Sequence, residues 1–391
     1  MYPKEFEDIL ACLPKPPEFS FDFEGVFETA LSGLLEKMRK TPQNPAWHAE
    51  GDVWTHTKMV CEELCALEEF RSLPENERLV LSLSALLHDA GKPFVTRLVD
   101  GAYVSPGHAA RGASEAREVL WRKAGLSGKR EYQCLRESVC FLIRYHTQPA
   151  HLHENENAAV KALKIAENVR LAPYFSAKNL CILTEADERG RINSDKEVRL
   201  LNIDLAREIF REARVWRSPY SFICETTRYA CLSGKNVWKD QELFDDTWGE
   251  VILMCGLAGT GKDTYIKEHY PNLPVVSLDD IRCEMKVSPD ENQGRVIQAA
   301  HEKARKYLRL KQPFVWNATS LMPSLRKNQV SLFEDYGARV KIVFLETGWA
   351  ENIRRDKERK RTVSEKVIGD MLKKLVPPEA FEARNVVWEC V

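Results

Sequence analysis

Residues 251–270, VILMCGLAGTGKDTYIKEHY, decide how the second half of the chain folds. An apolar run leads into the glycine-rich segment GLAGTGKDT at 256–264, and a helical pattern follows it. A phosphate-binding loop of the pattern G-x-x-x-x-G-K requires this order of strand, loop and helix, and Gly256, Gly261 and Lys262 are in register with it. We therefore expect the loop amides, the helix N-terminus and the Lys262 ammonium to bind phosphates.

The loop departs from the usual pattern at Asp263, where most such loops carry a hydroxyl residue that contacts Mg²⁺. A carboxylate can hold the ion through water, and Thr264 remains to contact a phosphate. We expect ATP or another nucleoside triphosphate to bind here with Mg²⁺. The predicted nucleotide-binding residues are Gly256, Leu257, Ala258, Gly259, Thr260, Gly261, Lys262, Asp263 and Thr264.

Short apolar runs alternate with helical patterns throughout this half of the chain. Such alternation predicts βαβ units and a parallel sheet buried on both faces, here with five strands. The expected strands are 251–255, 274–278, 313–318, 340–345 and 385–391.

The first half shows apolar residues at three- and four-residue spacing, which predicts an all-α domain. The expected helices lie within 26–40, 52–70, 77–90, 114–125, 134–146, 158–170, 178–190 and 200–214. The composition changes near 236–249, so we predict two domains, 1–240 and 248–391.

Composition restricts the class of protein. The chain has 391 residues and a net charge of −1, which does not indicate a general nucleic-acid binder. Its 11 cysteines form no CxxC pair, and neither a secretion signal nor a run of about 20 apolar residues is evident. We expect reduced thiols, a cytoplasmic location and no membrane partner.

Two further segments favour phosphate transfer. Asp279 ends the second expected strand, where ligands bind in open α/β sheets, and its carboxylate can accept a proton from an attacking hydroxyl. Arg282 can hold a phosphate. Arg355 and Arg359, four residues apart on a helix, would neutralise charge on the transferred group, unless the run is only a solvated basic face.

Together, the loop, SLDDIR (277–282), NATSLMPSLR (317–326) and the arginine-rich segment resemble the polynucleotide 5′-kinase group of P-loop kinases. The resemblance implies that Asp279 is the general base on a 5′-hydroxyl and that Arg282 grips the acceptor phosphate. It also implies that Arg355 and Arg359 belong to a lid. Asn317 and Thr319 stand in a segment where the family's phage member has an aspartate, which leaves the acceptor open.

The helical half contains a second pattern. A lone interior histidine is usually a core residue, but here several histidines and aspartates occupy the inner sides of different predicted helices. Imidazole with carboxylate suits one or two divalent ions such as Mn²⁺, Co²⁺, Ni²⁺ or Zn²⁺. The predicted ligands are His56, His88, Asp89, Asp187, His108 and His146.

This arrangement resembles the HD phosphohydrolase superfamily, and especially the HD domain of bacterial CCA-adding tRNA nucleotidyltransferases. The resemblance implies a core site of His56, His88, Asp89 and Asp187, with His108 and His146 at a second site or on the phosphate. His48 and Lys92 would also contact the phosphate.

An HD domain followed by a kinase domain resembles the bifunctional bacterial enzymes that heal RNA ends. The resemblance implies phosphorylation of 5′-hydroxyl ends and removal of 2′,3′-cyclic or terminal phosphates, so that an RNA ligase can act next. The RNA, whether tRNA or another, and the acceptance of DNA ends stay open. Two alternatives remain, a nucleotidase or cyclic-nucleotide phosphodiesterase fused to a small-molecule kinase, and a nucleotide-sensing regulatory protein.

Overall fold

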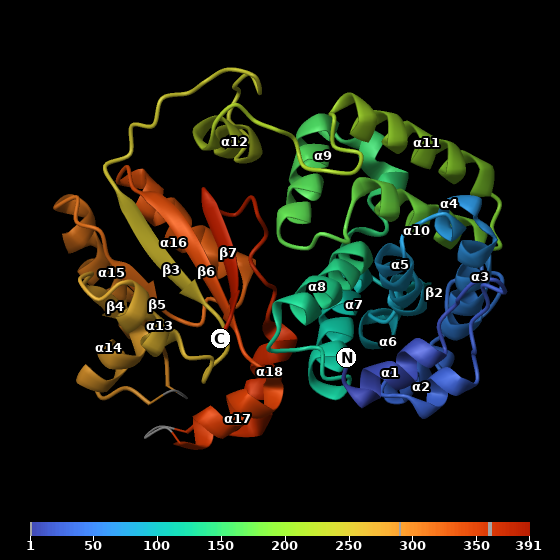
Figure 1. The fold of residues 1–391 in the computed structure, drawn as a ribbon, viewed down its shortest axis with the longest axis horizontal. Helices are drawn as coiled ribbons and strands as arrows, with labels where there is room; N and C mark the ends of the chain where they lie inside the picture. The colour runs from blue at the N-terminus through green and yellow to red at the C-terminus, as the bar shows by residue number, and fades with distance from the viewer. Residues whose placement is uncertain (1, 289–290, 359–361) are drawn as a thin grey trace. The chain divides into compact units, whose positions relative to one another are not determined.

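The computed structural model describes residues 2–288, 291–358 and 362–391. The chain divides into two compact units, Met1–Tyr220 and Ser221–Val391 (Figure 1). The first unit is helical, and the second is an α/β domain with a five-stranded parallel sheet. The fold class predicted from the sequence is therefore confirmed.

The first unit is built around helix α10 (Ala177–Arg189), which contacts α3, α5 and α8. Almost every residue of α10 is buried, so this helix is the centre of the unit. The other helices are α1 (Lys4–Ala11), α2 (Ser32–Arg39), α3 (Val53–Ala66), α4 (Glu68–Arg71), α5 (Glu75–Leu87), α6 (Lys92–Val95), α7 (His108–Glu118), α8 (Arg130–Tyr145), α9 (Ala158–Glu167) and α11 (Lys196–Glu212).

Local capping fixes where two of these helices begin. The Asp52 carboxylate accepts hydrogen bonds from the backbone N–H groups of Trp54 and Thr55 at 2.8 and 3.0 Å, at the start of α3. The Ser176 hydroxyl accepts from the N–H of Asn179 at 3.1 Å, at the start of α10. Both side chains satisfy amide groups that a helix N-terminus leaves without a partner.

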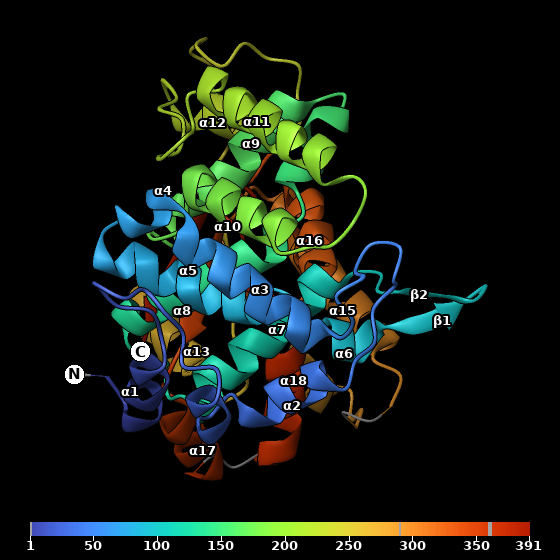
Figure 2. The ribbon, with the colours of Figure 1, turned by 90° about the vertical axis from the view of Figure 1, so that its right-hand side faces the viewer.

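A β-hairpin interrupts the helices. Strands β1 (Arg97–Val99) and β2 (Ala102–Val104) pair antiparallel and extend away from the helices of their unit (Figure 2). Asp100 and Gly101 have φ of 50° and 79°, the left-handed values of a two-residue type I′ turn. The sequence analysis did not predict this hairpin, although an Asp-Gly pair is a strong hairpin signal.

In the second unit the strand order is β4-β5-β3-β6-β7, and all neighbours are parallel. The strands are β3 (Glu250–Cys255), β4 (Val275–Ser277), β5 (Val315–Asn317), β6 (Arg339–Glu346) and β7 (Asn385–Cys390). The chain goes from β3 to one side of the sheet and then crosses to the other side at β6. The carboxyl end of β3 is thus the switch point at which such sheets bind ligands.

The helices of the second unit follow the strands in alternation. They are α12 (Glu225–Leu232), α13 (Lys262–His269), α14 (Leu278–Glu284), α15 (Gly294–Arg309), α16 (Pro323–Asp335), α17 (Trp349–Glu358) and α18 (Glu365–Lys374). Ile266 of α13 packs with Ile252, Met254, Val343 and Leu345 of β3 and β6 in one buried cluster. The helix that follows the glycine-rich loop is therefore anchored on the sheet.

Helix α12 belongs to the second unit, because the Arg228 guanidinium donates to the carbonyls of Ala380, at 3.2 Å, and Arg384. The domain limits predicted from the sequence, 1–240 and 248–391, stay a prediction. None of the helices in the described part of the chain has the length and apolar character needed to cross a membrane.

Candidate functional site

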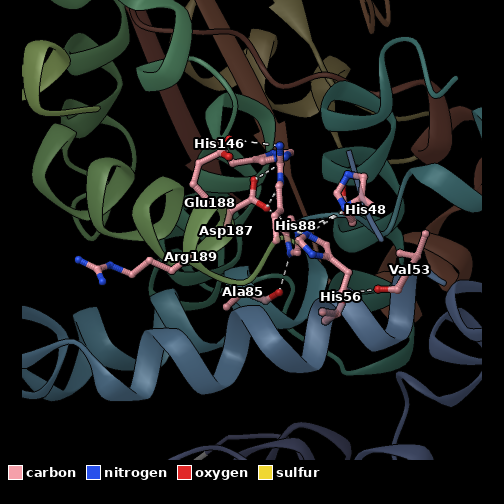
Figure 3. A network of polar contacts seen from close by, with 12 residues as sticks. His48, Val53, His56, Ala85, His88, His146, Asp187, Glu188 and Arg189 are labelled. Atoms are coloured by element: carbon pink, nitrogen blue, oxygen red, sulfur yellow. Dashed lines mark hydrogen bonds and ion pairs between the residues drawn. The ribbon is translucent and has the colours of Figure 1, made fainter. Parts of the chain in front are cut away.

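Six histidine and aspartate side chains, four of them labelled in Figure 3, meet in the interior of the first unit. They are His56 on α3, His88 and Asp89 directly after α5, His108 at the start of α7, His146 directly after α8, and Asp187 on α10. All except His108 are at most 1% exposed. These are the six residues that the sequence predicted as metal ligands.

His56, His88 and Asp187 form a first trio. Asp187 Oδ1 lies 3.0 Å from His56 Nε2 and 3.7 Å from His88 Nε2, and the two Nε2 atoms are 3.3 Å apart. Asp89 Oδ2 adds a fourth atom, 3.3 Å from His88 Nε2. In Figure 3 the rings of the first two and the Asp187 carboxylate point toward one another.

Asp89, His108 and His146 form a second trio, whose ligand atoms lie within 4.8 Å of one another. His108 Nε2 is 3.5 Å from Asp89 Oδ1. His146 Nε2 is buried and has no hydrogen-bond partner among the described residues. Asp89 therefore turns one carboxylate oxygen toward each trio, as a ligand shared by two ions would.

Backbone carbonyls fix the tautomers of three of these histidines. His88 Nδ1 donates to the carbonyl of Ala85 at 2.8 Å, and His146 Nδ1 donates to that of Ile143 at 2.6 Å. His108 Nδ1 donates likewise to the residue three positions earlier, at 3.0 Å. A carbonyl can only accept, so each Nδ1 carries the proton and each Nε2 lone pair faces the cluster. This is the arrangement of histidines that bind metals.

Glu50 is a further site residue that the sequence analysis missed. Its Oε1 accepts a hydrogen bond from His48 Nδ1 at 2.8 Å and lies 2.9 Å from His56 Nδ1, the latter at an ion-pair distance without good hydrogen-bond alignment. The Glu50 side chain is 1% exposed, and the neighbouring histidines hold the pKa of its carboxyl well below the ordinary value despite burial. Glu50 thus orients His56 from behind, and nothing in the local sequence pattern signals it.

Two cations offset the charge of the aspartates. Lys92 Nζ lies 2.7 Å from Asp89 Oδ2 and 3.3 Å from His48 Nε2. Arg191 donates to both oxygens of Asp187, at 3.1 and 2.5 Å. The predicted phosphate contacts His48 and Lys92 therefore lie beside the cluster, and Arg191 joins them although the sequence analysis did not name it.

The electrostatics favour the metal-binding protonation state at four of the six residues. Burial lowers the pKa of His146 to about 3 and also lowers that of His108, so both imidazoles are neutral. Burial opposes the ionisation of Asp89 and Asp187, but the adjacent lysine and arginine hold both carboxyl pKa values well below their usual range. His88 differs, because the Asp89 carboxylate outweighs burial and raises the pKa of the imidazole, so that an ion bound there would displace a proton. Neutral imidazoles with ionised carboxylates fit a divalent ion.

In the second unit, the phosphate loop connects β3 and α13 at the switch point of the sheet. Gly256 and Gly261 have φ of 146° and 88°, values that side-chain-bearing residues rarely adopt. Lys262 Nζ donates to the carbonyls of Gly256 and Leu257 at 3.1 and 2.7 Å. The Lys262 ammonium therefore lies against the loop, where it could contact the phosphates of a bound nucleotide.

The other predicted kinase residues lie on neighbouring elements. Asp279, on α14 just after β4, is exposed and forms an ion pair with Arg282. Arg355 on α17 pairs with Glu351 at 2.6 Å, and its guanidinium would be 3.2 Å from a Cβ on Gly261, so it reaches the loop. Arg359 lies outside the described residues.

Comparisons with known proteins match parts of the chain. A family model described as an AAA domain matches residues 251–378. Over 170 residues the chain is 29% identical to the Multifunctional CCA protein of Halorhodospira halophila, a match that covers 41% of this chain and 36% of that protein. A solved gluconokinase from Sinorhizobium meliloti 1021 is 18% identical over 36% of this chain and 83% of its own, with a TM-score of 0.28. The second unit is P-loop kinase-like, and the chain spans little more than a third of its curated relative.

Proposed function

We propose that the chain is a two-activity enzyme that prepares broken RNA ends for ligation. The second unit transfers the γ-phosphate of a nucleoside triphosphate to a 5′-hydroxyl end. The first unit is a metal-dependent phosphoesterase that removes 2′,3′-cyclic or terminal phosphates. The observation that carries the proposal is the occurrence, on one chain, of a buried His/Asp cluster and of a phosphate loop on the same sheet as Asp279 and Arg282, which follow strand β4.

The kinase proposal assigns a separate task to each residue around the loop. Asp279 is exposed at the carboxyl end of the sheet, where it accepts the proton of the attacking hydroxyl. Arg282, now paired with it, binds the acceptor phosphate when substrate enters. Lys262 and Arg355 neutralise the charge that develops on the transferred group. Mg²⁺, when bound with the donor nucleotide beside Asp263, would neutralise phosphate charge.

The phosphoesterase proposal rests on the two trios. One ion would be held by His56, His88 and Asp187. A second ion would be held by His108 and His146, and Asp89 would be a ligand of both ions. Such ions activate water and polarise a phosphoryl oxygen at neutral pH. Lys92 and His48, beside Asp89, are within reach of a phosphate that enters the cluster. Arg191 keeps the Asp187 carboxylate in one orientation.

The substrate class follows from pairing the two chemistries. Cleavage that leaves a 2′,3′-cyclic phosphate on one RNA end leaves a 5′-hydroxyl on the other, and these two units would act on those two ends. The similarity to a protein named Multifunctional CCA protein supports the assignment. It is in line with the resemblance of the motifs in the first unit to the HD domains of CCA-adding enzymes. An RNA ligase would act on the product.

The test of the kinase is direct. Purified protein, Mg²⁺ and γ-labelled ATP are incubated with a 5′-hydroxyl oligoribonucleotide, with the matching oligodeoxyribonucleotide, and with nucleosides and nucleoside monophosphates. We expect label on the oligoribonucleotide, reduced by roughly 10²–10⁴-fold in Asp279→Asn while ATP binding persists. Label on nucleosides or nucleoside monophosphates alone would indicate a small-molecule kinase of nucleotide metabolism instead. Binding of ATP without transfer would favour a regulatory protein.

A further inference from the structure

Asp263 occupies the position at which most phosphate loops carry a neutral hydroxyl. It is the second residue of α13, and its side chain is exposed beside the loop. Its Oδ1 accepts a hydrogen bond from Asn317 Nδ2 at 2.7 Å. Asn317 is the last residue of β5, the strand next to β3, so the two side chains meet at the switch point of the sheet.

The Asn317 contact holds the carboxylate in place without neutralising it. The amide is a neutral donor, and it is the one partner that Asp263 has among the described residues. A hydrogen bond of this kind restricts the rotamer of Asp263 and leaves the full negative charge of the carboxylate at the mouth of the loop. A serine or threonine there would carry no charge.

Electrostatics then distinguishes two forms of the nucleotide. Free ATP brings several negative charges to within a few ångströms of the carboxylate, and Coulomb repulsion at that distance is substantial near a protein surface. A divalent ion between the carboxylate and the phosphates reverses the sign of the interaction. Carboxylate and amide oxygens are ligands that Mg²⁺ accepts, directly or through its water shell.

We propose that Asp263, held by Asn317, makes nucleotide binding by this loop conditional on a divalent ion, so that the loop selects the metal–nucleotide complex and rejects the free nucleotide. Binding of nucleotide and binding of metal are then coupled more strongly than they are in a loop with a hydroxyl. Asp263 contributes the charge, and Asn317 is a positioning residue. The inference rests on the nucleotide site of the proposed kinase but needs no particular acceptor.

The test measures ATP affinity by titration calorimetry on the full chain, once in Mg²⁺ and once in EDTA. The ratio of the two dissociation constants reports the coupling. In wild type we expect ATP to bind far more weakly in EDTA than in Mg²⁺. In Asp263→Ser the ratio should fall by roughly tenfold or more, mainly because binding in EDTA becomes tighter.

Three further variants make the result specific. Asn317→Ala frees the carboxylate and should give an intermediate ratio. Glu268→Gln removes an exposed charge from the same helix and should leave the ratio unchanged. Lys262→Ala should abolish the loop-dependent part of the binding, which separates it from any ATP bound elsewhere.

The outcomes separate this inference from the proposed function. An unchanged ratio in Asp263→Ser, or a fall in Glu268→Gln as large as in Asp263→Ser, would overturn the inference. Absence of ATP binding under both conditions in the wild type would also overturn it. The expected ratios, found in a protein that labels no oligonucleotide, would support the inference and reject the end-healing kinase.

Discussion

Glu50 contacts two histidines at once, and this contact determines how firmly the first trio is held. The carboxylate lies against the outer nitrogen of His56 while the inner nitrogen faces Asp187. A buried carboxylate behind a ligating imidazole fixes the ring and makes it a stronger donor. Glu50 should therefore contribute to metal affinity without touching the ion.

We expect Glu50→Gln to weaken metal binding by about 10–100-fold while the protein stays folded, because the amide keeps the shape but not the charge. The measurement is competition for Mn²⁺ or Zn²⁺ against a chelator of known affinity, with circular dichroism as a check of the fold. Glu62→Gln, an exposed change on α3, the helix that carries His56, is the matched control. Equal competition by both variants would assign Glu50 a purely structural role.

The residues of this cluster differ in how far the sequence could reveal them. Most of the histidines and aspartates were identifiable because they end or interrupt apolar helical stripes, whereas His108 was identified through the resemblance of its segment to HD domains. Glu50 could not be found this way, since it precedes α3 in a loop without periodicity. Arg191 could not either, because its importance lies in a contact with Asp187 that only the folded turn after α10 creates.

At the scale of elements, the close approach of α6 to α7 brings both Lys92 and His108 against the Asp89 carboxylate, one at each oxygen. Gly91 makes this approach possible. A Cβ at Gly91 would lie 2.0 Å from the carbonyl oxygen of His108 and 2.4 Å from the backbone nitrogen of Gly112, both rigid atoms. The absence of a side chain at Gly91 is thus a condition for the second trio.

We expect Gly91→Ala to force α6 and α7 apart and to destabilise the unit by about 1–3 kcal/mol through overpacking. Metal content should fall with it, because His108 moves away from Asp89. Thermal unfolding and bound-metal analysis measure the two effects. Gly33→Ala is the control, since the nearest atom there is the flexible Lys123 ammonium at 3.9 Å. A Gly91 variant as stable and metal-rich as the control would reject this account.

A buried ion network joins α7 to α8 and thereby the helices that carry His108 and His146. Glu137 of α8 accepts from Arg117 of α7 at 2.7–2.9 Å and from Arg136 at 2.8 Å. Burial raises the pKa of the Glu137 carboxyl, but the two guanidinium groups outweigh it and hold the pKa below the ordinary value. The stabilisation is therefore present above the carboxyl's unfolded-state pKa and is lost as the pH falls through the folded-state value.

Glu137→Gln should cost about 3–5 kcal/mol of unfolding free energy at neutral pH, because it removes the negative charge that Glu137 supplies to two buried guanidinium groups. The difference between variant and wild type should shrink as the pH falls through the lowered folded-state pKa of Glu137. Chemical denaturation at several pH values measures this. A difference that does not change with pH would mean that packing, not charge, makes Glu137 important.

The elements were predicted unevenly, for reasons visible in particular segments. All five strands of the sheet were predicted, since a parallel strand buried on both faces reads as an unbroken apolar run such as 251–255. The hairpin at Arg97–Val104 was missed, because its strands are three residues long and mostly exposed, which leaves no alternation to detect. Only the turn at Asp100–Gly101 signalled it.

At the scale of the whole molecule, each candidate site is built within one compact unit. The His/Asp cluster lies within Met1–Tyr220, and the phosphate loop with Asp279 and Arg355 lies within Ser221–Val391. If the two chemistries are independent, a change that disables one site must leave the other intact.

The reciprocal pair Asp89→Ala and Lys262→Ala tests this independence in the full-length protein. Asp89→Ala removes the carboxylate that faces both trios, so metal-dependent release of phosphate should fall by roughly 10²-fold or more while 5′-phosphorylation persists. Lys262→Ala removes the loop cation, so 5′-phosphorylation should be lost while metal-dependent release of phosphate persists.

Both activities are measured on one oligoribonucleotide with a 5′-hydroxyl and a 2′,3′-cyclic phosphate, so that each preparation is its own control. Loss of both activities in either variant would mean that the units act on the RNA in concert, and persistent hydrolysis in Asp89→Ala would locate that chemistry outside the cluster.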